Sequence, residues 1–127
     1  MPLGNRQDFE MHSGDDVDLV ITVEDENEVG VLLAAASGIW WQLGRLKTGA
    51  STPAPAQPGQ PLIAKALGAA SGITLSGLSG YVVALSGVDT DTIRGGEFYH
   101  ESQVLLNGKR TTVMWGVATL HVDLIEE

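Results

Sequence analysis

Cysteine is absent from the 127 residues, and basic residues are scarce. Without cysteine the fold contains no disulfide, which suits a reducing cytosol, and both cysteine-ligated zinc modules and thiol catalysis are excluded. Seven Lys and Arg stand against 16 Asp and Glu, so the net charge is -9 and the pI is near 4.5. This charge balance argues against binding to nucleic acid or to an anionic membrane through a basic surface.

Long apolar runs are also missing. No stretch approaches the roughly 18 consecutive apolar residues that a membrane-spanning helix requires, and the opening MPLGNRQDFEMHSGDD is polar where a secretory signal would be apolar. We therefore expect synthesis in a cytoplasm and no membrane contact. A chain of this length supports one hydrophobic core, so we expect a single domain over residues 1–127. Within it, residues 1–8 are expected to form a flexible N-terminal arm.

What the sequence does contain is alternation with a period of two, the pattern of half-buried β-strands. In DVDLVITVE, residues 16–24, apolar residues occupy every second position. In GIWWQLGRL, residues 38–46, Trp41 falls on one face and Trp40 on the other. Further strands are predicted at residues 61–67, 73–75, 81–85, 97–106 and 110–124. The pair Asn107-Gly108 between the last two runs predicts a type I′ hairpin turn.

About seven short strands separated by glycine-rich turns predict an all-β, antiparallel β-sandwich. Residues 47–60, KTGASTPAPAQPGQ, contain Pro53, Pro55 and Pro58, which disfavour ladder hydrogen bonds and predict one long, mobile Pro/Ala-rich loop. The Leu and Ala content of residues 29–37 leaves a short helix open there. Residues predicted to lie buried between two sheets are Val17, Leu19, Ile21, Val23, Trp41, Val83, Leu85, Phe98, Val104, Leu120 and Val122.

The stretch GEFYHESQV, residues 96–104, holds the strongest chemical candidates. Adjacent strand residues point to opposite sides of a sheet, so His100 cannot share a ligand or a proton with Tyr99 or Glu101. A hydrogen-bonded core histidine is therefore the favoured interpretation of His100. His12 and His121 lie far apart in the sequence and lack ligand spacing, so we expect no zinc site.

Other catalytic and metal-binding patterns are weak. No G-x-S-x-G elbow or phosphate-binding loop is present. A small hydrolase using Asp89, Asp91 and His100 is the enzymatic alternative. Acidic segments at residues 15–16, 24–28 and 89–91 have oxygen ligands for calcium, but without an EF-hand pattern they are better explained as solvated turns. We expect a protein that is not an enzyme and has no cofactor or bound metal.

Several motifs in order resemble the immunoglobulin-like domain of tailed-phage virion proteins, such as the N-terminal domains of baseplate upper proteins and similar small tail proteins. They are SGDDVDLVITVE, GIWWQLGRL, GVDTDT, GEFYHE and NGKRTTVMWG, which together span about Phe9 to Leu124. The resemblance implies an immunoglobulin-like sandwich and a non-enzymatic assembly block of the tail or baseplate. It implies a symmetric homo-oligomer located in the virion, in contact with other phage virion proteins.

The resemblance also bears on the corner before residue 96. Immunoglobulin-like sandwiches commonly anchor such a corner through a tyrosine hydroxyl. Phe98 occupies the corresponding position, so the corner would depend on packing. Thr90 and Asp91 are expected to fix it by bonding to nearby backbone amides.

Two tryptophans and three prolines are the residues expected to bind a partner. Trp40 and Trp115 lie on the faces opposite to Trp41 and Met114, and we expect both to be wet in a lone monomer. They are predicted, with Pro53, Pro55 and Pro58, to contact neighbouring virion subunits. A tryptophan covered by the protein's own loop is the alternative to this interface. The alternative functions are a capsid decoration protein and a carbohydrate-binding host-adhesion module, in which Trp40, Trp115 or Tyr99 would stack on a sugar.

Overall fold

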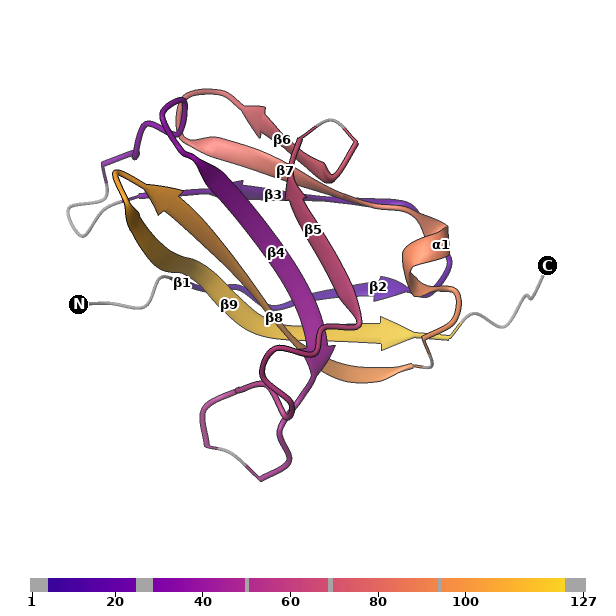
Figure 1. The fold of residues 1–127 in the computed structure, drawn as a ribbon. Coiled ribbons are helices and arrows are strands. Elements are labelled where there is room, and N and C mark those ends of the chain that lie inside the picture. Colours follow the sequence, from indigo (N-terminus) through magenta and orange to yellow (C-terminus); the bar gives the residue numbers. More distant parts are fainter. Residues whose placement is uncertain (1–4, 25–28, 50, 69, 94, 123–127) are drawn as a thin grey trace.

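The computed structural model describes residues 5–24, 29–49, 51–68, 70–93 and 95–122. Strands dominate this part of the chain, and helix is confined to one turn (Figure 1). The elements are β1 Asn5–Arg6, β2 Phe9–His12, β3 Val17–Thr22, β4 Gly38–Arg45, β5 Ile63–Leu67, β6 Gly72–Ser76, β7 Gly80–Leu85, α1 Gly87–Thr90, β8 Gly96–Leu106 and β9 Lys109–His121.

The strands form one sheet in the order β1-β9-β8-β4-β5-β6-β7-β3, and β2 pairs with β9 beyond β1. This sheet folds over until it nearly closes like a barrel, with two facing layers (Figure 1). The prediction of an all-β, sandwich-like fold is therefore confirmed. The two expected sheets are one continuous sheet, however, and the pairing is not purely antiparallel, because β1 and β2 run parallel to β9 and β5 runs parallel to β6.

The β8–β9 hairpin follows directly from the sequence. Asn107 has φ 53° and Gly108 has φ 77°, the left-handed conformations that a type I′ turn requires. The two strands pair from Leu106↔Lys109 to Gly96↔Leu120, with one register irregularity between Ser102 and Gln103. This hairpin is the longest paired unit of the sheet.

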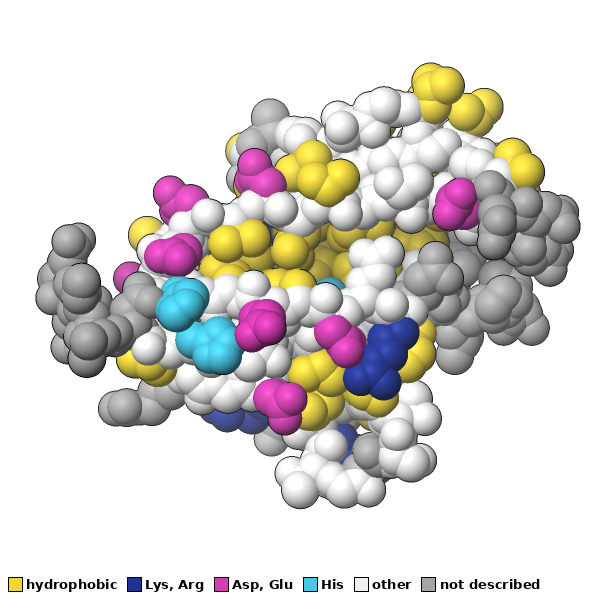
Figure 2. Space-filling model, turned by 180° about the vertical axis from the view of Figure 1, so that it is seen from behind, with side chains coloured by type: hydrophobic (Ala, Val, Ile, Leu, Met, Phe, Trp, Pro, Cys, Tyr) yellow, Lys and Arg dark blue, Asp and Glu magenta, His cyan; other side chains and the backbone are white. Residues whose placement is uncertain are grey.

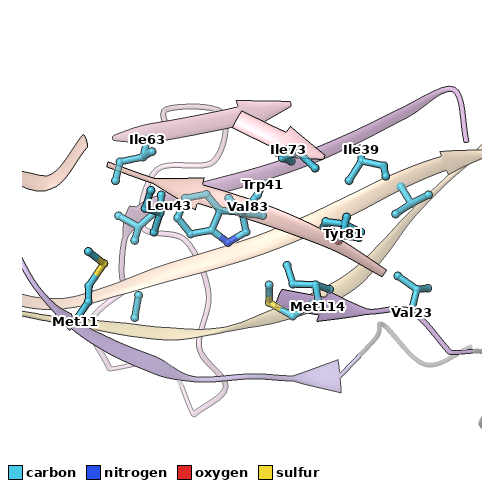
Figure 3. Packing of buried hydrophobic residues seen from close by; sticks show 14 of the residues in the cluster. Met11, Val23, Ile39, Trp41, Leu43, Ile63, Ile73, Tyr81, Val83 and Met114 are labelled. Atoms are coloured by element: carbon cyan, nitrogen blue, oxygen red, sulfur yellow. The ribbon is translucent and has the colours of Figure 1, made fainter. Parts of the chain in front are cut away.

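The predicted core is largely confirmed. Ile21, Val23, Trp41, Val83, Leu85, Phe98, Val104 and Leu120 are buried. Val17 and Leu19 are only partly buried, and Val122 is 61% exposed because β9 ends at His121. Figure 3 shows Trp41, which is 0% exposed, among side chains from β4, β5 and β7. Buried residues that the prediction omitted are Met11, Leu33, Ile39, Leu43, Ile63, Ile73, Tyr81, Met114 and Ala118.

Residues 29–37 form no helix. Two of their amides donate outside the segment: Val31 N–H donates to the Val23 carbonyl at 2.9 Å, and Leu33 N–H donates to the Leu78 carbonyl at 3.0 Å. Leu33 is 1% exposed, so this segment covers the core with one apolar side chain. Bonds to other segments therefore take the Val31 and Leu33 amides, which a helix would need for its local i to i−4 bonds.

The one helical turn, α1, lies in the predicted corner. The Ser86 amide donates to Asp89 Oδ2 at 2.8 Å, an N-terminal cap that supports the turn. Thr90 accepts a hydrogen bond at 2.9 Å from the Gly14 amide, which is remote in the sequence, so the expected bond to a nearby amide is wrong. This hydrogen bond attaches α1 to the connection between β2 and β3.

Two segments expected to be unpaired carry backbone hydrogen bonds. Residues 5–6 of the predicted flexible arm form β1 beside β9, while residues 1–4 lie outside the described residues. At the base of the Pro/Ala loop, Lys47 N–H donates to the Ala54 carbonyl at 2.9 Å and Ala56 N–H donates to the Arg45 carbonyl at 2.8 Å. The prolines do not prevent this pairing, because the donated amides belong to Lys47 and Ala56.

Candidate interaction face

Four neighbouring strands present a continuous solvent side, which we call the outer face. It comprises the outward-pointing residues of β5, β4, β8 and β9. Strand alternation separates the adjacent tryptophans, so that Trp41 is fully buried in the core and Trp40 lies half-buried on the outer face. The outer face carries Trp40, Gln42, Ala64, Ala66, Tyr99, Glu101, Gln103, Trp115 and Val117.

Trp40 is held against its own sheet. Its ring lies directly over Gly38, where any Cβ atom would collide with it. The guanidinium carbon of Arg110, from the start of β9, lies 4.0 Å from the ring centroid. This is a close cation–π contact. The indole is therefore positioned by contacts within the chain before any partner arrives.

Trp115 has a similar but looser cover. The guanidinium carbon of Arg6 lies 5.7 Å from the Trp115 ring centroid, and Arg6 Nε is 3.1 Å from Asp8 Oδ1. Trp115 is half-buried, as is Trp40, so each ring is only partly exposed to water, where the expectation had been that both would be wet in a lone monomer. The rings are covered by arginine side chains and not by a loop of the protein, which was the alternative considered from the sequence.

A polar strip separates the two tryptophans. Gln103 pairs across the sheet with Trp40, and Glu101 pairs with Trp115. The Gln103 amide group donates to Glu101 Oε2 at 3.3 Å and to Thr112 Oγ1 at 3.4 Å. The tryptophans are thus two separate anchors and not one apolar patch.

Tyr99 is the third aromatic residue of the outer face. It lies opposite Gly44 and Val117 and is half-buried. Burial, and secondarily the charge of Glu101, raise the pKa of Tyr99 to about 12. The phenol therefore remains neutral over the physiological range and can act as a hydrogen-bond donor to a partner.

A shallow groove of about 560 Å³ lies beside Trp40. Ala64 and Ala66, opposite Gln42 and Trp40, keep its floor low. Lys65 also lines it, but the Lys65 ammonium is 2.8 Å from Asp89 Oδ2 and is held there. The groove is lined by Trp40, Gln42, Ala64, Lys65, Ala66, Ala70, Ser71 and Gly72. Its shape and mixed polarity suit a flat group placed next to the indole.

The Pro/Ala loop does not share a patch with Trp40. It leaves the opposite end of β4 and projects away from the sheet (Figure 1). Pro53 and Pro55 are partly buried and Pro58 is exposed. A partner that touches both Trp40 and the loop must therefore extend along the full length of β4.

His100 is the hydrogen-bonded core histidine that the sequence predicted, with 1% exposure. Trp41 Nε1–H donates to His100 Nδ1 at 3.1 Å, so His100 Nε2 carries the proton and donates to the Gln7 carbonyl at 2.6 Å. Burial lowers the pKa of His100 below 6.5, against the opposing effect of the Gln7 bond. Both nitrogens are committed to structure, and Tyr99 and Glu101 lie on the opposite side of the strand.

A second buried polar contact crosses the core. Ser102 Oγ donates to the Trp40 carbonyl at 2.7 Å, which leaves the Tyr81 hydroxyl as the donor to Ser102. Burial raises the pKa of Tyr81 to about 12. This bond ties β7 to β8 across the interior and fixes the backbone that carries Trp40.

The candidates for acid–base chemistry do not converge. Asp89 binds Lys65 and the Ser86 amide, whereas His100 binds Trp41 and Gln7. Within the described ranges, no three His, Asp or Glu side chains gather in a way that could hold a metal ion. The small-hydrolase alternative therefore has no assembled site among these residues.

One histidine pair escaped sequence reasoning. Parallel pairing of β2 with β9 places His12 opposite His121, with ring centroids 5.4 Å apart. His121 Nε2 lies 2.7 Å from Glu10 Oε2. The signal could not be found in the sequence, because it depends on the register between strands more than 100 residues apart.

No protein-family model matches the chain, and no curated protein matches it. In the part of the chain that the structure describes, no helix has the length and apolar character needed to cross a membrane.

Proposed function

We propose that the protein is a non-enzymatic virion structural protein of a tailed phage, an immunoglobulin-like assembly block of the tail or baseplate. The outer face is the observation that carries this proposal. Trp, Tyr and Arg are the residue types most enriched at binding hot spots, and the outer face combines Trp40 under Arg110 with Trp115 under Arg6. Such pre-positioned anchors bind a partner with little loss of side-chain entropy.

The overall charge supports the same proposal. With a net charge of -9, the surface complements basic patches on another virion subunit. A weak contact at each copy becomes stable when identical subunits repeat around a symmetric ring, so a homo-oligomer within the particle fits this role. Placement in the tail or baseplate rests on the sequence resemblance, and placement on the capsid as a decoration protein is the alternative within the same class.

Incorporation into particles tests the proposal. We expect the variant carrying Trp40→Ser and Trp115→Ser to fold and to be lost from purified particles, because both anchors are removed. The matched control carries Leu78→Ser and Val88→Ser, which change two side chains that are 75% and 77% exposed and lie off the outer face. Normal incorporation of the folded tryptophan variant would contradict the proposal.

The groove beside Trp40 favours one alternative of a different class, a carbohydrate-binding host-adhesion module. A sugar ring in the groove would lie over the low floor formed by Ala64 and Ala66 and beside the indole, whose two faces are covered by Gly38 and Arg110. A glycan array separates the two functions. Binding that is abolished by Trp40→Ala and retained in Trp115→Ala would support adhesion through the groove, while an array without binding would favour assembly.

A further inference from the structure

The folded sheet stops short of closure along one seam. Among the strands that the structure describes, β3 pairs with β7 alone and β2 pairs with β9 alone. These two strands are consecutive in the chain and form the two lips of the opening. Among the described strands, β3 is thus an edge whose outer side has no partner, a position at which another chain can add a strand.

Apolar side chains at the seam are incompletely covered. Inward residues in the middle of the sheet are 0–2% exposed, as on β4 and β7. By contrast Phe9 of β2 and Val17 and Leu19 of β3 pack against the core but remain only partly buried. Figure 2 shows the result as a hollow between the two layers with hydrophobic atoms on its floor.

The backbone of β3 is arranged to bond outward at this seam. The Val23 amide donates to the Ser79 carbonyl at 2.8 Å, continuing the ladder in which Thr22 lies opposite Gly80. Bonded pairs alternate along an antiparallel ladder, so the N–H and C=O groups of Asp18, Val20 and Thr22 point away from β7. These groups are the template for an added strand.

Acidic residues occupy both lips. Asp18 and Glu24 stand exposed on the β3 side, and Glu10 stands exposed on the β2 side. Figure 2 shows acidic side chains above and below the hollow. A second copy of this chain, with a net charge of -9, would be repelled from such a seam, whereas Lys or Arg flanking an apolar strand would be attracted.

We propose that the seam binds an extended segment of a partner protein, with alternating apolar residues flanked by Lys or Arg, as an additional strand on the free edge of β3. Its apolar side chains cover Phe9, Val17 and Leu19, and its flanking cations face Asp18, Glu24 and Glu10. Binding at the seam does not depend on the outer face or on a place in a virion.

The probe is a fluorescently labelled peptide, RKVTVTVKR, measured by anisotropy against the intact chain. The reference peptide EEVTVTVEE has the same apolar pattern and the opposite charge. We expect saturable binding of the basic peptide that weakens as salt is added, and roughly tenfold weaker binding of the acidic peptide. Equal affinity for the two peptides, or no binding of the basic one, would overturn the proposal.

Two variants locate the site. Val20, which is 67% exposed, is changed to Pro to remove one outward amide, and Val20→Thr keeps that amide as the matched control. We expect about fivefold or greater loss of affinity in V20P and wild-type affinity in V20T. A variant with Asp18→Lys and Glu24→Lys should prefer the acidic peptide. Unchanged binding by a folded V20P chain would exclude the β3 edge.

Sedimentation of the chain alone distinguishes the occupants. We expect V20P and the wild type to have the same mass in solution. An oligomer of the wild type that dissociates in V20P would show that a second copy fills the seam, which would contradict the proposed basic partner.

Discussion

His100 joins three segments that are remote in the sequence. Its ring accepts a hydrogen bond from Trp41 of β4, donates one to the carbonyl of Gln7, and meets the edge of Phe9 with ring centroids 4.8 Å apart. An apolar residue of this size would leave the buried Trp41 N–H without a partner, at a cost of about 1–3 kcal/mol, and would also remove the donor to the Gln7 carbonyl. The histidine is thus a structural connector.

Because His100 must be neutral to accept from Trp41, stability depends on pH. The unfolded chain takes up this proton near pH 6.5, whereas burial lowers the pKa in the folded chain. The free energy of unfolding is therefore expected to fall as pH drops below 6.5, by up to about 1.4 kcal/mol per pH unit for one group. Denaturant unfolding at pH values above and below 6.5 measures this fall in the free energy of unfolding.

His100→Gln is the control for this pH effect. Glutamine offers an acceptor oxygen and a donor NH₂ group, and it does not titrate. The variant keeps His12 and His121, so a flatter pH profile assigns the difference to His100. Equal profiles in the wild type and the variant would place the effect elsewhere.

Trp41 is the largest fully buried side chain. Trp41→Ala is expected to destabilise the protein by roughly 3 to 5 kcal/mol, because it opens a cavity among β4, β5 and β7 and removes the partner of His100 Nδ1. Thermal and denaturant unfolding measure this change. Gln42→Ala, at the next and exposed position of the same strand, should stay within about 0.5 kcal/mol. An unchanged unfolding midpoint in Trp41→Ala would be inconsistent with its burial.

At the scale of elements, the passage from β1 to β2 depends on Gly116 of β9. A Cβ atom at Gly116 would collide with the Gln7 carbonyl oxygen and lie 2.7 Å from Asp8 Oδ1. Both atoms hold the strands together, since Gln7 binds His100 and Asp8 Oδ1 accepts from the Val117 amide at 2.9 Å. Gly116 therefore lets the N-terminal segment approach the sheet.

Gly116→Ala is expected to lower stability by about 1–3 kcal/mol, because the added methyl group must displace this backbone. Gly44→Ala is the matched control, since its Cβ would meet nothing closer than 3.8 Å. Denaturant unfolding compares the two variants. If they behave alike, close approach at Gly116 is not what limits the β1–β2 packing.

The elements differ in how far the sequence predicts them. Strands β3, β4 and β7 are predictable because local alternation determines which side is buried, and the Asn107-Gly108 turn sets the β8–β9 register. β1 and β2 are not predictable in this way, because their stability comes from parallel pairing with β9 at the far end of the chain. α1 is a single turn, too short to leave a periodic pattern.

The outer face, too, is predictable from the sequence only where local strand alternation determines it. Alternation correctly separates outward Trp40 from buried Trp41. It cannot show that Arg110 and Arg6 cover the tryptophans, since both contacts depend on tertiary register. The Tyr81–Ser102 bond could not be predicted for the same reason, because it crosses the interior between β7 and β8, which are not neighbours in the sheet.

At the scale of the whole molecule, the acidic excess opposes folding through self-repulsion. With a net charge of -9, added NaCl is expected to raise the unfolding temperature by screening this repulsion. Chloride is the suitable anion, because sulfate also stabilises by exclusion from the surface. The exposed carboxylates of Asp15 and Asp18 provide the control: a variant with Asn at both positions should show a smaller rise. A salt response of the same size in both proteins would rule out this cause.

The parallel pairing of β2 with β9 determines how the chain resists mechanical force. Because neighbouring parallel strands start at the same end, a pull on the entry to β1 and an opposite pull on the exit from β9 act along the strands. The load then shears all the hydrogen bonds between these strands at the same time and cannot open them one by one. These bonds include the one from Gln7 N–H to the Trp115 carbonyl and the one from Val117 N–H to Asp8 Oδ1. A protein tethered at both ends would therefore yield only at high force.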